Sequence, residues 1–190
     1  MKTSFRLFLS SLLIMLISST AMAKQYLNAD QERASVRESA NTILEKLYAT
    51  QPGSKQVIEG AAGYAVFSNF GVKILLAGGG TGKGIAVNNK TKAETFMKMA
   101  EVQAGLGLGV KSYNLVWVFQ TQDGFDQFVN SGWELGGQAT AAAKVDDKGG
   151  AVQGAVSIAP GVWLYQMTKN GLALELTVKG TKYYKDSDLN

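Results

Sequence analysis

The sequence predicts an α+β domain in which an antiparallel sheet, closed as a barrel or folded as a sandwich, packs against N-terminal amphipathic helices. Three observations predict this class. Short β-branched and aromatic runs bounded by glycine recur from residue 61 onward, which is typical of strands. The chain has 22 glycines and only 2 prolines, which favours closely packed sheets over disorder. Helical spacing of apolar residues is concentrated before these strands.

The first 23 residues have the pattern of a signal peptide. Two basic residues precede an apolar run from Leu7 to Ile17, and Ala21-Met22-Ala23 fits the A-x-A cleavage pattern. We expect residues 1–23 to be removed and residues 24–190 to form a single domain that is exported, periplasmic or secreted. No later stretch is apolar over about 18 residues, so we expect no transmembrane helix in the mature chain.

The chain contains no cysteine and no histidine. Without disulfides, an exported domain must take its stability from its core. Without histidine and cysteine, the chain also lacks the usual general base, the thiol nucleophile and the common transition-metal ligands. The paired carboxylates Asp146-Asp147 and Asp186 with Asp188 lie in turn or tail sequence, where solvated charge is the ordinary explanation. The sequence therefore predicts a protein that is not an enzyme and has no metal and no cofactor.

Two helices are expected on the N-terminal side. The first is predicted from Asn28 to Thr50, with Asn28 and Gln31 forming a capping box. Its apolar positions recur at helical spacing: Val36, Ala40, Ile43, Leu44 and Leu47. Balanced charge on its polar face favours packing on the sheet over lying on a membrane. A shorter helix is predicted from Pro52 to Gly60.

Residues 61–87 combine strand-like runs with a glycine-rich segment. Tyr64–Phe67 and Val72–Leu76 are bounded by glycine and predict two strands. The segment Gly78–Gly84 resembles a phosphate-binding loop, but Ala77 stands where that loop needs glycine, and a strand-like run rather than a helix follows. We therefore interpret Gly78–Gly84 as a hairpin turn whose glycines permit positive φ and close backbone approach.

The middle of the chain gives one ambiguous segment and two clear ones. Thr95–Val102 fits a strand or a helical turn, whereas the alternation of Gly105–Gly109 predicts a strand with glycines on one face. Leu115–Phe119 is typical of a buried strand. Asp123 is expected to cap a short helix that ends at Gly132. Its apolar face is predicted to comprise Phe125, Phe128 and Val129.

Only strands and turns are expected after this helix. Strands are predicted at Gly137–Val145, Ala151–Ile158 and Val162–Thr168, and Asn170-Gly171 predicts a tight hairpin. The polar tail after Tyr184 is expected to fray. An outer-membrane barrel is the main architectural alternative. It is disfavoured because alanine and glycine interrupt the apolar alternation that its strands require.

Basic residues gather in and after the glycine-rich segment. Without the leader, 17 basic and 15 acidic residues remain, a net charge of +2. Residues 60–122 contain six lysines against Glu94 and Glu101 only. This excess is typical of a protein with an anionic partner, although ordinary solvated lysines explain it equally well. The modest total charge disfavours nucleic acid.

Four segments in order resemble the SYLF domain, also called the Ysc84-type lipid-binding domain. They are AAGYAVF, GGGTGKGIAV, GLGLGVKSYNLVWVF and WLYQMTKNGLALELTVKGTKYY, and the resemblance runs from about Asp30 to Tyr184. It implies membrane-lipid binding, and some eukaryotic members bind phosphoinositides or actin. For an exported protein we carry over the general property, peripheral association with an anionic phospholipid surface.

The resemblance and the basic excess together give the candidate lipid-binding residues. Lysines near glycine-rich segments would meet lipid phosphates, while two aromatic side chains insert. The candidates are Lys73, Lys83, Lys111 and Lys169, with Phe70 and Trp133 as the aromatics. Such aromatics are more often core residues than anchors. Two other hypotheses stay open: an envelope scaffold module with possible self-association, and a carrier with one apolar ligand inside the barrel.

Overall fold

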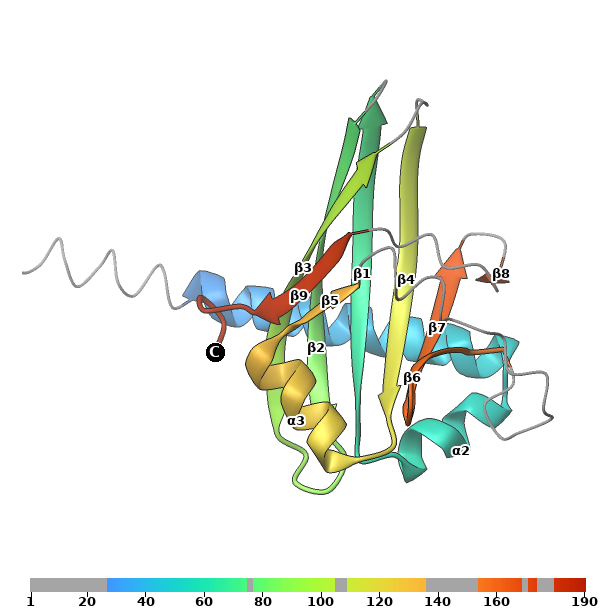
Figure 1. The fold of residues 1–190 in the computed structure, drawn as a ribbon. Helices are drawn as coiled ribbons and strands as arrows, with labels where there is room; N and C mark the ends of the chain where they lie inside the picture. The colour runs from blue at the N-terminus through green and yellow to red at the C-terminus, as the bar shows by residue number, and fades with distance from the viewer. Residues whose placement is uncertain (1–26, 75–76, 105–108, 136–153, 169–170, 174–179) are drawn as a thin grey trace, which may run out of the picture.

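The computed structural model describes residues 27–74, 77–104, 109–135, 154–168, 171–173 and 180–190. One curled antiparallel sheet forms its centre, with the strand order β5-β9-β3-β2-β1-β4-β7-β6 and with β8 paired to β7 (Figure 1). The predicted α+β class, with a barrel-like sheet and N-terminal helices, is confirmed. The predicted signal peptide lies outside the described residues.

Four long strands form the middle of the sheet. They are β1 (Gly63–Ile74), β2 (Ala77–Asn88), β3 (Glu94–Ala104) and β4 (Gly109–Phe119). The pairing of β1 with β2 runs without a shift from Gly63 opposite Asn88 to Ile74 opposite Ala77. At the end near Ile74 these strands project beyond the described helices, at the top of Figure 1.

The glycine-rich segment differs from its prediction. The two predicted strands are one continuous strand, β1, and Gly78–Gly84 lies inside β2 rather than in a turn. None of these glycines has positive φ. A run without side chains can pair through its backbone alone, so apolar periodicity does not detect it. The predicted close approach is confirmed at Gly84, where an added Cβ would clash with the Val66 carbonyl oxygen and the Phe67 ring.

The remaining strands are shorter. They are β5 (Trp133–Leu135), β6 (Val156–Ala159), β7 (Val162–Thr168), β8 (Gly171–Ala173) and β9 (Thr181–Lys185). Thr95–Val102, which fitted either a strand or a helical turn, lies in the strand β3. The predicted strand at Gly137–Val145 lies outside the described residues, as does most of Gly105–Gly109. The antiparallel pairing of β7 with β8 agrees with the predicted hairpin at Asn170-Gly171, although Asn170 itself is not described.

The helices lie on both faces of the sheet. A helix over residues 27–50 crosses one face, while α3 (Gln122–Ser131) packs on the other, and α2 (Gly53–Gly60) follows the first helix (Figure 1). The predicted capping box at Asn28 is wrong because residue 27 is already helical. The predicted Asp123 cap is also wrong: the Thr121 hydroxyl accepts a 3.2 Å hydrogen bond from the Gly124 amide.

The sheet separates two apolar clusters. On the face toward the N-terminal helix, here called the helix face, Val66, Val116 and Tyr165 pack against Ile43 and Leu47. On the opposite face, here called the aromatic face, four rings form the centre of the second cluster: Trp117, Phe119, Phe128 and Tyr183. Every side chain of the predicted buried strand Leu115–Phe119 is 0% exposed, which confirms that prediction.

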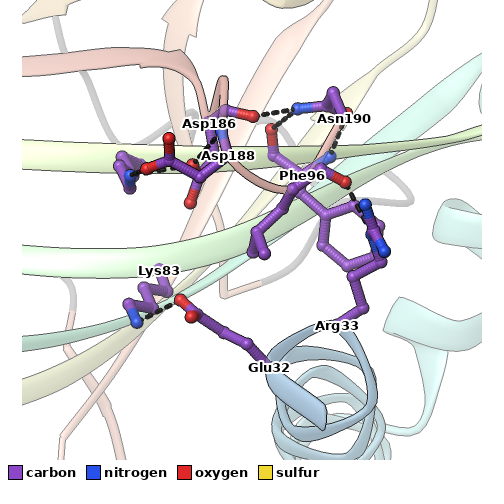
Figure 2. A network of polar contacts seen from close by, with 9 residues as sticks. Glu32, Arg33, Lys83, Phe96, Asp186, Asp188 and Asn190 are labelled. Carbon is purple, nitrogen blue, oxygen red and sulfur yellow. Dashed lines mark hydrogen bonds and ion pairs between the residues drawn. The ribbon is translucent and has the colours of Figure 1, made fainter. Parts of the chain in front are cut away.

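The C-terminal tail is held against the sheet, so the prediction that it frays is wrong. Asp186 and Leu189 are buried. The Asn190 side-chain amide donates hydrogen bonds of 2.7 Å to the Phe96 carbonyl oxygen and 2.6 Å to that of Asp186 (Figure 2). The Arg33 Nε atom donates a 2.8 Å hydrogen bond to the Leu189 carbonyl oxygen. The tail therefore joins β3 to the N-terminal helix.

Candidate functional site

The projecting end of the long strands contains three of the six predicted site residues. We call this end the tip, and define it as residues 70–74 of β1, 77–81 of β2, 100–104 of β3 and 109–112 of β4. It includes the positions of Phe70, Lys73 and Lys111.

Strand pairing places two lysine positions of the tip together. Lys111 is paired with Gly71, and Lys73 is paired with Gly109. The two lysine positions are therefore diagonal neighbours on adjacent strands, and they lie on the same face of the sheet. This is the aromatic face, because Tyr113 has the same alternation along β4.

The opposite face of the tip is uncharged. Val72 is paired with Val110 in β4 and with Gly79 in β2, and Gly79 is paired with Val102 in β3. The Val102 side chain is 70% exposed. Phe70 alternates with Val72 and shares its face. At these four strand ends, no helix-face position is occupied by Asp, Glu, Lys or Arg.

Lys83 lies away from the tip lysines and on the other face. It is paired with Ser68 in β1 and with Lys98 in β3, on the helix face. Its ammonium group forms an ion pair with Glu32 of the N-terminal helix (Figure 2). The Lys83 side chain is 55% exposed and that of Glu32 33%. The structure therefore does not bring Lys83 together with Lys73 and Lys111.

Trp133 belongs to the aromatic cluster rather than to the tip. It is half-buried at the start of β5, with its ring centre 5.7 Å from that of Trp117 and 6.2 Å from that of Phe128. Lys169, the remaining predicted residue, lies outside the described residues. The six predicted residues thus do not form one site.

A cleft of about 500 Å³ lies between the N-terminal helix and the helix face of the sheet. We call it the helix–sheet cleft. Its deep wall is apolar and buried, with Val36, Ala40, Ile43 and Val66. Its rim is polar and exposed, with Ser35, Ser68, Thr81 and Lys83. The cleft is thus amphipathic and opens to solvent along its rim.

Lys98, which also lines the cleft, is held by the C-terminal tail. Its Nζ atom lies 2.8 Å from an Asp186 oxygen and 2.9 Å from an Asp188 oxygen. The hydrogen bonds to Asp186 and then Asp188 raise the pKa of Lys98 above its usual value. The ammonium group therefore remains charged and its charge is already balanced.

Comparisons with known proteins identify the family. A family model described as Las17-binding protein actin regulator, Ysc84, matches residues 100–190. Beta cell expansion factor A from Aeromonas veronii is 34% identical over 161 residues, which cover 85% of this chain and 60% of that protein. The chain belongs to the Ysc84 family. It spans about 60% of the length of that Aeromonas relative.

Ysc84-family domains, also called SYLF domains, are generally binding domains rather than enzymes. In this Ysc84-family chain, no group of three or more metal-ligating His, Cys, Asp or Glu side chains occurs among the described residues. Nor does the described part contain a helix that is long and apolar enough to cross a membrane.

A buried polar cluster on the aromatic face of this Ysc84-family chain escaped prediction from the sequence. Glu101 is 2% exposed, and its carboxylate accepts a 2.8 Å hydrogen bond from the Asn69 amide and another from the Tyr113 hydroxyl. Burial, followed by the hydrogen bond to Glu101, raises the pKa of Tyr113, which keeps this hydroxyl protonated as a donor. One signal was present: Glu101 shares the alternation of the apolar residues Met97 and Met99.

The helix–sheet cleft was also missed. The helix side of its apolar wall was correctly predicted as the apolar face of the N-terminal helix, which was expected to pack on the sheet, but no cleft between the two was predicted. Ser35 and Ser39 were the available signal, since they neighbour the inward positions Val36 and Ala40 and are short and polar. The sheet residues of the cleft come from strands far along the chain, so their arrival beneath this helix depends on the tertiary fold.

Proposed function

We propose that this chain is a non-enzymatic module of the cell envelope that associates peripherally with anionic phospholipid membranes through its tip. One observation carries the proposal. The pairing of β1–β4 gives the projecting tip two neighbouring lysine positions on one face and only uncharged positions on the other.

Membrane physics explains why this arrangement suits a lipid surface. A lysine near an anionic membrane contributes about 1 kcal/mol, and buried apolar area adds to the binding. The tip has both lysine positions and apolar positions at one end of the molecule. Binding should weaken as salt rises, because the electrostatic part is screened within about 10 Å at 0.1 M ionic strength.

The exported location predicted from the leader belongs to this proposal, since it determines which membranes the domain meets. The positions of Lys73 and Lys111 are each paired with a glycine and lie next to apolar positions, which distinguishes this tip from an ordinary solvated lysine surface. Family membership supports a binding role in general.

Protein interaction is the second candidate function. The Ysc84 family model carries the description Las17-binding protein actin regulator, which names a protein partner and a cytoskeletal process. In this case the uncharged face around the exposed Val102 would meet a protein or a second copy of the chain. A rise in mass with concentration, without lipid, would favour this candidate.

Vesicle co-sedimentation tests the membrane proposal. Residues 24–190 are mixed with vesicles of phosphatidylcholine alone or with phosphatidylglycerol added. We expect binding to the anionic vesicles only, and Lys73→Glu with Lys111→Glu should weaken it at least about tenfold, given about 1 kcal/mol per lysine removed and added repulsion. Val102→Asp should also weaken binding, because it places a charge on the uncharged face.

The matched control reverses two lysines at the far end of the molecule. Lys55 in α2 and Lys90 in the β2–β3 turn are both exposed, and their double change to Glu alters the net charge equally. This control should retain most of the binding. Equal sedimentation with neutral and anionic vesicles, or an equal loss in the control, would remove the proposal.

A further inference from the structure

We propose that the helix–sheet cleft binds one molecule of a single-chain anionic amphiphile, a long-chain fatty acid being the simplest example. Among the residues that the structure describes, this site shares only Thr81 with the tip. Its chemistry differs as well, since it would hold one lipid inside the fold rather than meet a membrane surface. It also differs from a ligand inside the curl of the sheet, because the cleft lies between the sheet and the N-terminal helix.

The size and the inner lining of the cleft suit an acyl chain. Its volume of about 500 Å³ falls within the range of roughly 300–1,000 Å³ that is usual for small-molecule sites. Val36, Ala40 and Ile43 supply the helix side of the apolar wall, and Val66 supplies the sheet side. These four side chains are buried, at 7%, 6%, 5% and 1% exposure. Because little of this wall meets water, the acyl chain would gain mainly van der Waals contact with it and would remove its own apolar surface from water.

The rim supplies the groups that a carboxylate needs. Ser35 and Ser39 lie one turn apart on the helix, and Ser68 and Thr81 lie opposite them on β1 and β2. Hydroxyl groups donate hydrogen bonds to carboxylate oxygens. The Lys83 ammonium lies at the same rim, so an anionic head group would meet a cation and several donors together.

Lys83 is the cation that can change partner. Its ion pair with Glu32 joins two side chains that are 55% and 33% exposed, and such surface pairs contribute only about 0–1 kcal/mol. A ligand carboxylate could therefore replace Glu32, whose own carboxylate would return to water at little cost. Lys98 is different, because Asp186 is buried and, together with Asp188, balances its charge.

The arrangement selects one class of ligand. The apolar wall runs along one side of one helix, which suits one acyl chain rather than the two chains of a phospholipid. Lys83 favours an anionic head over a neutral one. The competition with Glu32 makes a prediction of definite sign: neutralising Glu32 should strengthen binding, whereas neutralising Lys83 should weaken it.

The experiment uses the fluorescent fatty acid 11-(dansylamino)undecanoic acid, titrated into delipidated residues 24–190 and then displaced by palmitate. We expect saturable binding of one equivalent, with native mass spectrometry giving the same stoichiometry. Lys83→Gln should raise the Kd about tenfold, and Glu32→Gln should lower it about threefold. Lys90→Gln, an exposed lysine outside the cleft, is the matched control and should leave the Kd unchanged.

Two further arms separate the head group from the chain. Hexadecanol, which has the chain of palmitate without its charge, should have the same inhibition constant for the wild type and for Lys83→Gln, once the different Kd of the probe is taken into account. Ala40→Phe should abolish binding by filling the cleft. Because that variant can also disturb packing, the opposite effects of Lys83→Gln and Glu32→Gln provide the decisive result. A non-saturable signal would overturn the proposal, as would a Kd that neither Lys83→Gln nor Glu32→Gln alters.

The outcome is independent of the membrane proposal. The tip variant with Lys73→Glu and Lys111→Glu should bind the fatty acid as the wild type does. Conversely, Lys83→Gln should co-sediment with anionic vesicles as the wild type does. If the test of one site fails, the test of the other site can therefore still succeed, and the two outcomes are distinguishable.

Discussion

Tyr165 is a buried side chain whose hydroxyl has no hydrogen-bond partner among the described residues. It lies in the apolar cluster on the helix face of the sheet. Burying a hydroxyl without a partner costs free energy of folding, about 1–3 kcal/mol in mutational series. Burial also raises the pKa of Tyr165 to about 12, from a usual value of 10.0. Both effects make a definite prediction for its replacement.

Tyr165→Phe should leave the free energy of unfolding at pH 7 unchanged or raise it by about 1 kcal/mol, since it removes an unpartnered group. Tyr165 is neutral in the native state, so its contribution to the free energy of unfolding does not change with pH below about pH 10. That contribution is lost as pH rises from about 10 to about 12, while the unfolded chain ionises. The variant should therefore lose less stability in this window.

Urea unfolding at pH 7 and at pH 11 measures both effects. The wild type serves as the reference at each pH, and the difference between the two proteins should move in favour of Phe at the higher value. A Phe variant that is clearly less stable than the wild type at pH 7 would show that the hydroxyl has a partner.

Gly84 shows how a single residue sets the closeness of β1 and β2. A Cβ at this position would clash with the Val66 carbonyl oxygen, which belongs to the backbone and cannot yield easily. At Gly79, on the other face, an added Cβ would meet only the Glu101 carbonyl oxygen at an ordinary 3.5 Å. The two glycines thus form a matched pair within one strand.

Gly84→Ala should lower the free energy of unfolding by about 1–3 kcal/mol, as overpacking of a filled interior does. Gly79→Ala should be neutral or slightly stabilising, because it restricts the unfolded chain without a clash. Chemical denaturation of the two variants side by side is the measurement. Equal effects at both positions would contradict the close packing seen at Gly84.

At the level of elements, periodicity predicts those segments whose side chains are sorted by burial. The N-terminal helix, α3 and β4 were found in this way, because their apolar residues recur at regular spacing. Within β2, only Gly78–Gly84 was misjudged as a turn, since a glycine-rich strand is held by backbone hydrogen bonds that leave no side-chain pattern. The C-terminal tail was misjudged for a similar reason: its anchors are polar contacts with distant elements.

Removal of residues 186–190 should destabilise the protein by about 3 kcal/mol or more. The deletion loses the Lys98–Asp186 ion pair, the buried Leu189 side chain and the hydrogen bonds of Asn190. Burial of one leucine contributes about 1.5–3 kcal/mol, and each hydrogen bond about 0.5–1.5 kcal/mol. A thermal scan should show a melting temperature lower by roughly 10 °C.

A conservative change in the same tail provides the control. The Asp188 side chain is 78% exposed, so Asp188→Asn should shift the melting temperature only slightly. A truncated protein that melts within about two degrees of the wild type would mean that the tail is not part of the cooperative fold.

For the whole molecule, burial on both sides of the sheet should decide which strands open last. The centres of β1 and β4 lie between two apolar clusters, and Val116, Trp117 and Val118 are each 0% exposed. β5 and β6 stand at the two ends of the strand order. The tip belongs to the same long strands as the protected centre but extends past the described helices.

Hydrogen exchange should therefore vary along single strands. Amides of Leu115–Phe119 should exchange only through global unfolding, whereas those of β5 and β6 should exchange faster. Within β2, residues 79–81 should exchange faster than residues 85–87. Mass spectrometry with peptide-level resolution measures this order, and slow exchange across the whole of β2 would mean that the tip is covered.

The general architecture was predictable, whereas the functional surfaces were only partly so. Composition and element order indicate an antiparallel α+β domain. The sequence also singled out Lys73 and Lys111, but only strand pairing shows that they share a face and that Lys83 does not. The helix–sheet cleft is lined by Val36 of the N-terminal helix and Val66 of β1, together with residues of later strands. These residues are far apart in the sequence, so no local pattern predicts that they line one cleft.

The sheet separates the two apolar clusters, and this separation has a consequence for evolution. The residues on the side of the N-terminal helix belong to one cluster, and the aromatic cluster lies on the other face of the sheet. Distant, independent sites combine almost additively in their effect on stability. Descendants of one ancestral scaffold can therefore accumulate substitutions on one face of the sheet while the packing on the other face is inherited unchanged.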